Sequence, residues 1–87
     1  MSIKQDSSER KQIFVRLKKI VVQELSVKSD EVKWESRFIE DLGADSLDMV
    51  ELVLAIEESF DIEVPDKLVN DIQRVSEAVE LIYQKSR

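Results

Sequence analysis

The sequence predicts an all-α protein, a small four-helix bundle with a short third helix and a long loop between helices one and two. Two observations carry this prediction. The 87 residues include only one glycine and one proline, a composition that favours helix over sheet or disorder. Apolar residues also recur at helical spacing in three separate stretches. A chain of this length makes one domain, so we expect residues 1–87 to fold as a single unit.

The first helix is expected over residues 7–25, because its apolar residues fall on one face. These are Ile13, Phe14, Leu17, Ile20, Val21 and Leu25. Asp6 followed by Glu9 gives a capping signal at its start. Residues 26–45 lack helical periodicity, and a loop of this length is expected to pack on the domain and to contain a short helical turn. Its apolar anchors would be Val27, Val32, Trp34, Phe38, Ile39 and Leu42.

The second helix is expected over residues 46–59, after a turn that Gly43 allows. Asp45 and Ser46 are both good N-cap residues for it. Pro65 then introduces a short third helix over residues 66–71. The fourth helix is expected over residues 75–85, where one apolar face recurs. That face consists of Val75, Ala78, Val79, Ile82 and Tyr83.

The second helix has two apolar arcs when its residues are placed at steps of about 100°. One arc should face the core, and it consists of Met49, Leu52, Val53, Ile56 and Phe60. Leu47, Val50 and Leu54 form the other arc, which Asp48, Glu51 and Glu58 border. The second arc either buries against another helix or forms a docking ridge, and an exposed apolar patch of this kind tends to mark an interaction site.

Charge is distributed unevenly along the chain. The net charge is −6, yet residues 40–66 carry ten acidic side chains and no basic one. This block favours basic partners and disfavours nucleic acid, whose phosphates it would repel. No apolar run approaches the ~20 residues of a membrane span, and the N-terminus lacks the apolar segment of a secretory signal. We therefore expect an acidic cytoplasmic protein that acts as a monomer.

The residue types that support most catalysis are missing. The chain contains no cysteine and no histidine, which argues against thiol or histidine-based catalysis and against the usual zinc sites. An EF-hand that begins at Asp41 is also excluded, because position six would be Ser46 in place of glycine. We expect no enzyme activity and no metal site.

Ser46 is the strongest candidate for a functional residue. It lies in the run Asp41-Leu42-Gly43-Ala44-Asp45-Ser46-Leu47-Asp48, at the expected start of a helix and among small side chains. A lone Asp-Ser before a helix is usually an ordinary cap. The full flank, with Glu51-Leu52 and Glu57-Glu58 after it, instead resembles the attachment site of the acyl carrier protein family.

The resemblance covers essentially the whole chain and is most specific from Asp41 to Glu51. It looks like a discrete type II carrier of fatty acid synthesis. It implies that a carrier-protein synthase transfers 4'-phosphopantetheine from coenzyme A to Ser46, so that the protein becomes a phosphoprotein. The thiol of this covalent arm would hold acyl intermediates as thioesters and deliver them to basic surfaces of fatty acid synthesis enzymes. Arg74 departs from the family, since relatives often place threonine there. Without that threonine the helix lacks a capping hydroxyl worth about 1 kcal/mol.

The resemblance and the charge pattern together predict two sets of residues around Ser46. The partner face is expected to consist of Asp45, Leu47, Asp48, Val50, Glu51, Leu54 and Glu58. An acyl-chain pocket is expected to be lined by Met49, Val53, Ile56, Phe60, Val64, Val69 and Ile72.

Two other functions remain open on the sequence. An aminoacyl or peptidyl carrier would use the same fold and the same serine, although the acidic surroundings look more like a fatty acid carrier. A helical interaction module without a carrier role would leave Ser46 unmodified. The intact mass of the protein from its native host distinguishes these cases.

Overall fold

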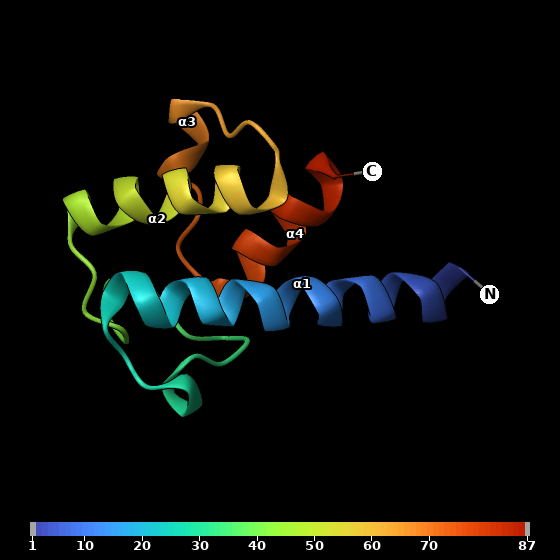
Figure 1. The fold of residues 1–87 in the computed structure, drawn as a ribbon, viewed down its shortest axis with the longest axis horizontal. Helices are drawn as coiled ribbons and strands as arrows, with labels where there is room; N and C mark the ends of the chain where they lie inside the picture. Colours follow the sequence, from blue (N-terminus) through green and yellow to red (C-terminus); the bar gives the residue numbers. More distant parts are fainter. Residues whose placement is uncertain (1, 87) are drawn as a thin grey trace.

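A long N-terminal helix organises the protein. The computed structural model describes residues 2–86, and the side chains of residues 8–86. The elements are α1 (Ser2–Leu25), a 3₁₀ turn η1 (Ser29–Glu31), α2 (Ser46–Phe60), α3 (Asp66–Val69) and α4 (Val75–Lys85). α1 packs against both α2 and α4, whereas α3 packs on α2 (Figure 1). The predicted all-α bundle with a short third helix is confirmed.

α1 begins earlier than predicted, at Ser2, so Asp6 lies inside the helix and does not cap it. No glycine or proline interrupts the residues before Ser7, and the helix continues through them. Its 24 residues correspond to a length of about 36 Å. Figure 1 shows α1 extending past the end of α4 toward the N-terminus.

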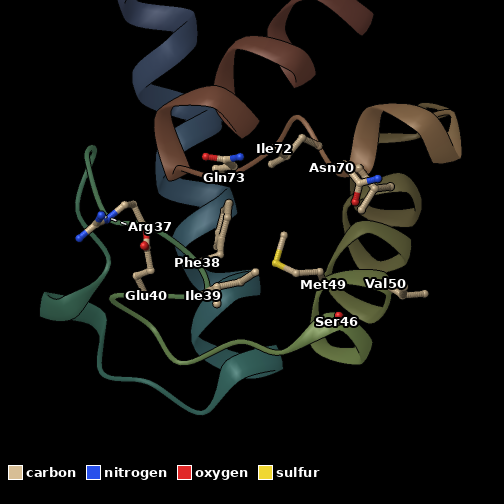
Figure 2. Close-up of a pocket in the computed structure, with 11 residues that line it drawn as sticks. Arg37, Phe38, Ile39, Glu40, Ser46, Met49, Val50, Asn70, Ile72 and Gln73 are labelled. Carbon is tan, nitrogen blue, oxygen red and sulfur yellow. Dashed lines mark ion pairs between the residues drawn. The ribbon is translucent and has the colours of Figure 1, made fainter.

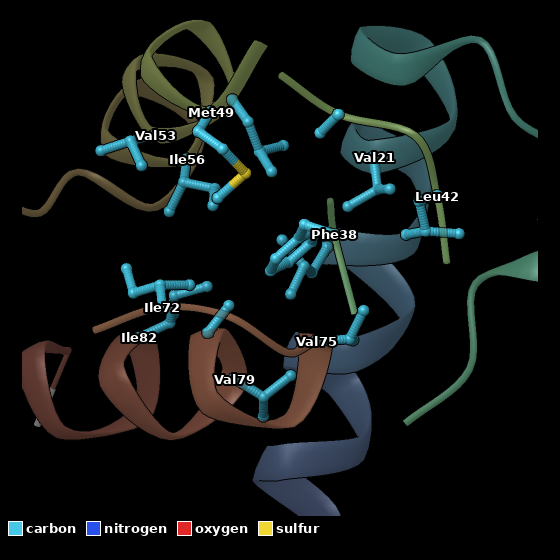
Figure 3. Close-up of a cluster of buried hydrophobic side chains, with 14 of the residues drawn as sticks. Val21, Phe38, Leu42, Met49, Val53, Ile56, Ile72, Val75, Val79 and Ile82 are labelled. Atoms are coloured by element: carbon cyan, nitrogen blue, oxygen red, sulfur yellow. The ribbon is translucent and has the colours of Figure 1, made fainter. Parts of the chain in front are cut away.

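The core lies where α1, α2 and α4 meet the long loop (Figure 3). Its largest fully buried side chains include Phe38 from the loop, Leu17 from α1 and Leu52 from α2. Burying a side chain of this size stabilises the fold by about 1.5–3 kcal/mol. The apolar periodicity of the sequence therefore identified the inner faces of the helices correctly.

Two arginines of α1 bind side chains or backbone of α4 and α2. Arg10 pairs with Glu80 of α4 at 2.6 Å and lies over the ring of Tyr83. Arg16 donates from Nη2 to the carbonyl of Ser59 at 2.7 Å and lies 4.2 Å from the ring centroid of Phe60. The second contact places a cation at the C-terminal end of α2, where the helix dipole favours it.

The long loop is pinned to the start of α4 by backbone hydrogen bonds. The N–H groups of Val75 and Ser76 donate to the carbonyls of Ser36 and Trp34, both at 2.9 Å. The N–H of Phe38 donates to the carbonyl of Gln73, also at 2.9 Å. The first N–H groups of a helix have no partner within the helix, and here the loop supplies two of the missing acceptors.

The capping hydroxyl that Arg74 lacks is replaced by other acceptors. The N–H groups that a cap hydroxyl would serve are those of Ser76 and Glu77, and they donate to the carbonyls of Trp34 at 2.9 Å and Arg74 at 3.1 Å. Oε1 of Glu77 also accepts from the N–H groups of Gln73 at 2.8 Å and Arg74 at 2.9 Å. Every backbone N–H from residue 73 to residue 77 therefore has an acceptor. The side chain of Arg74 is free to pair with Glu35, at 3.2 Å.

The loop prediction holds except at two of the six anchors, Trp34 and Ile39. Trp34 is 38% exposed, although its ring packs edge-on against Phe14 with the centroids 5.7 Å apart. η1 is the short helical turn expected, and Val32, Phe38 and Leu42 are buried. Ile39, however, is 59% exposed. The N–H of Gly43 donates back to the carbonyl of Ile39 at 3.2 Å, and the side chain of Ile39 lies at the surface of this turn.

Candidate functional site

The segment before α2 folds back on itself in a compact turn. The carbonyl of Arg37 accepts from the N–H groups of Asp41 and Leu42, and the N–H of Ala44 donates to the carbonyl of Phe38 at 2.9 Å. Gly43 has a φ of +77°, in the region that side chains disfavour. No atom lies within 4 Å of the position that its Cβ would take, so the backbone alone requires glycine here.

Asp45, and not Ser46, is the N-cap of α2. Its Oδ1 accepts from the N–H of Asp48 at 2.9 Å, and Oδ2 of Asp48 accepts from the N–H of Asp45 at 3.1 Å. This is a complete capping box. Ser46 is the first residue of the helix, is exposed, and its hydroxyl makes no hydrogen bond within the described part of the chain. The helix therefore does not depend on the hydroxyl of Ser46, which remains available for modification.

A pocket of about 460 Å³ opens beside Ser46 (Figure 2). It lies between α2, the turn at residues 37–40 and the segment at residues 69–73. Its lining residues are Arg37, Phe38, Ile39, Glu40, Ser46, Met49, Val50, Val69, Asn70, Ile72 and Gln73. This volume falls within the range of about 300–1,000 Å³ that is typical of small-molecule sites.

The structure brings three of the seven residues expected for an acyl pocket to this cavity: Met49, Val69 and Ile72. Val53, Ile56 and Val64 are buried in the core, and Phe60 is half-buried beneath Arg16. The sequence did not indicate the turn at residues 37–40 as a wall. A signal for it was present, since Phe38 and Ile39 are consecutive apolar residues shortly before the turn at Gly43.

The residues expected to form the partner face all lie on α2 or at its N-cap. Leu47, Val50 and Leu54 are 64%, 50% and 55% exposed, so they do not bury against another helix. Asp45, Glu51 and Glu58 are exposed, and Asp48 is half-buried. Ile39 adds a further exposed apolar side chain close to Ser46 at the pocket.

Arg37, which precedes the acidic block of residues 40–66, neutralises two of its carboxylates. Arg37 pairs with Glu40 at 3.0 Å and with Asp41 at 3.2 Å. The backbone N–H of Arg37 also donates to Oδ2 of Asp41 at 2.8 Å, and this bond, followed by that of the guanidinium, holds the pKa of Asp41 below its usual value. In the part of the chain that the structure describes, Glu51 and Glu58 have no such partner. These two carboxylates of α2 are therefore free to meet an external cation.

A helical bundle that presents an exposed serine at a helix start, beside an apolar pocket, is the architecture of a carrier domain. Residues 15–82 match the family model described as "Phosphopantetheine attachment site". The chain is also 54% identical, over 70 residues, to an acyl carrier protein of Sulfurovum sp. (strain NBC37-1), an alignment that covers 80% of this chain and 93% of the relative. The chain belongs to the acyl carrier protein family. It is a carrier and not a catalyst, and its cofactor is 4'-phosphopantetheine.

The structure also describes no helix between residues 2 and 86 that is long and apolar enough to cross a bilayer.

Proposed function

We propose that Ser46 bears the phosphopantetheine arm and that the protein delivers acyl thioesters to the enzymes of fatty acid synthesis. One observation carries this proposal. The hydroxyl of Ser46 is exposed at the start of α2 and has no hydrogen-bond partner among the described residues, while Asp45 caps the helix in its place. The similarity to the acyl carrier protein of Sulfurovum supports the acyl cargo.

The residues around Ser46 fit the group that it would carry. The bound arm supplies a terminal thiol on which the acyl group is held as a thioester. Its phosphodiester would lie at the N-terminus of α2, where the helix dipole stabilises an anion by roughly 0.3–1 kcal/mol. The carboxylates of Asp45 and Asp48 oppose this gain, so modification should change stability little.

The α2 face supports a basic enzyme as the partner. Glu51 and Glu58 provide carboxylates that have no ion pair among the described residues, and Leu47, Val50 and Leu54 provide exposed apolar area. Such a surface favours fast encounter through charge, followed by apolar contact. The complexes should weaken as salt rises, because exposed charges are screened over about 8 Å at physiological ionic strength.

The pocket beside Ser46 supports a saturated acyl chain as the cargo. Its buried walls are apolar and come from Phe38, Met49 and Ile72. Each methylene that moves there from water should contribute about 0.8 kcal/mol. An aminoacyl group would gain less from these walls, so loading assays with acyl and aminoacyl donors should favour the acyl group.

Mass spectrometry with a serine variant tests the attachment site. The protein is incubated with coenzyme A and a carrier-protein synthase, and its intact mass is followed. Ser46→Ala should show no mass increase. Ser59→Ala, an exposed serine at the other end of the same helix, should be modified like the parent protein. Full modification of Ser46→Ala would refute the proposal.

A further inference from the structure

Met49 occupies the boundary between the pocket beside Ser46 and the interior of the bundle. It lines the pocket, yet it is only 6% exposed and belongs to the buried core cluster. Figure 2 shows its side chain reaching into the space between the turn that holds Phe38 and the segment that holds Ile72. In Figure 3 the same side chain lies next to Val53 and Ile56 of the core. Met49 therefore separates the pocket from the deeper apolar region.

The other buried walls of the pocket are stiffer than Met49. Phe38 is fully buried, and its N–H is bonded to the carbonyl of Gln73. Ile72 is β-branched, which restricts its first side-chain torsion. Among the buried lining residues in the described range, only Met49 has an unbranched aliphatic side chain. A methionine has three rotatable bonds and adapts to irregular spaces at low cost.

We propose that Met49 is the movable inner wall of this pocket and that it determines how long an acyl chain the protein shelters. A short chain occupies the pocket as far as Met49. A longer chain turns the side chain of Met49 aside and continues toward Val53 and Ile56. This inference rests on the proposed attachment of the acyl arm to Ser46 and adds a residue that sets chain-length preference.

The test compares acyl forms of increasing length. Holo protein is loaded with saturated acyl groups from butanoyl to hexadecanoyl, and each form is melted and exposed to hydroxylamine. In the parent protein, Tm and protection of the thioester should rise with length and change slope where the chain reaches Met49. Met49→Ala should move that change of slope to longer chains. Met49→Ile, which keeps the bulk but loses the flexibility, should end the rise at the original length.

Leu52→Ala is the matched control. Leu52 is a fully buried residue of the same helix that does not line the pocket. This variant should lower Tm for every acyl form and leave the position of the slope change where it is. A slope change at the same length in the parent protein, Met49→Ala and Met49→Ile would overturn the role of Met49.

The outcomes also separate this inference from the function on which it rests. Normal loading at Ser46 with a flat series in the parent protein would refute the inference alone. A failure of Ser46 to accept the arm would refute both. Hydroxylamine protection provides a measure besides Tm, so a destabilised Met49→Ala still gives a decisive result as long as it can be loaded.

Discussion

Reversal of the charge at Glu51 should slow the modification of Ser46, while the same reversal elsewhere should not. Glu51 is exposed on α2 and has no ion pair within the described chain. A pair of unit charges 4 Å apart in water is worth about 1 kcal/mol. Exchanging attraction for repulsion approximately doubles this, to about 2 kcal/mol, and longer distances and screening reduce it to roughly 1.4 kcal/mol, a tenfold effect.

The assay is kcat/KM of a carrier-protein synthase at low and at physiological salt. Glu51→Lys should lower it roughly tenfold at low salt, and the deficit should shrink as salt rises. Asp30→Lys provides an equal change in net charge. Asp30 lies in η1, on the other side of α1 from α2 (Figure 1), and a helix about 10 Å thick exceeds the screening length.

Asp30→Lys should therefore change kcat/KM by less than about twofold. Glu80 is a poor control, because it already pairs with Arg10 at 2.6 Å and its reversal would disturb the fold. Equal losses in Glu51→Lys and Asp30→Lys would mean that net charge alone matters. The reasoning from a defined α2 face would then be wrong.

Two further predictions concern stability. Arg16→Met removes the bond to the carbonyl of Ser59 and the contact with Phe60. Together these are worth about 1 kcal/mol, so Tm should fall by about 4–8 °C. Lys19→Met on the exposed side of α1 should leave Tm unchanged, and similar melts for the two variants would contradict the role of Arg16. The pKa of Asp41 is lowered, first by the hydrogen bond from the N–H of Arg37 and then by that from its guanidinium. The ionised Asp41 therefore stabilises the fold above its unfolded pKa of about 3.9, and this stabilisation disappears as pH falls through the lower folded pKa. Asp41→Asn should therefore destabilise the protein at neutral pH and not at strongly acidic pH, as measured by denaturant titration, and a loss that does not depend on pH would contradict this explanation.

Local patterns in the sequence predicted most of the fold. The residues 75–85 expected as the fourth helix are those of α4, and the inner residues of α2 were identified from their spacing. Leu47 and Leu54 of the partner face are exposed, as the interpretation of this arc as a docking ridge required. These features depend on periods of a few residues, so the sequence alone contains them.

The features that the sequence did not reveal depend on contacts between distant segments. One acceptor that replaces the cap hydroxyl at Arg74 is the carbonyl of Trp34 in the long loop, and no local pattern indicates that this carbonyl lies nearby. The pocket depends on the approach of the turn at residues 37–40 to the segment at residues 69–73. The choice between Asp45 and Ser46 as N-cap could have been made, because Asp48 is correctly spaced to complete the box with Asp45.

The hydrogen bonds between the long loop and the start of α4 also limit how this protein can be recombined with its relatives. Trp34 and Ser36 provide acceptors to α4 through their backbone carbonyls, and Phe38 is bonded to Gln73. A chimera that exchanges only the loop keeps these bonds if the new loop follows the same path; on any other path, N–H groups of α4 lose their acceptors. A chimera that exchanges residues 34–38 together with residues 73–77 keeps the junction intact. These two segments form one exchangeable unit, although they lie far apart in the chain.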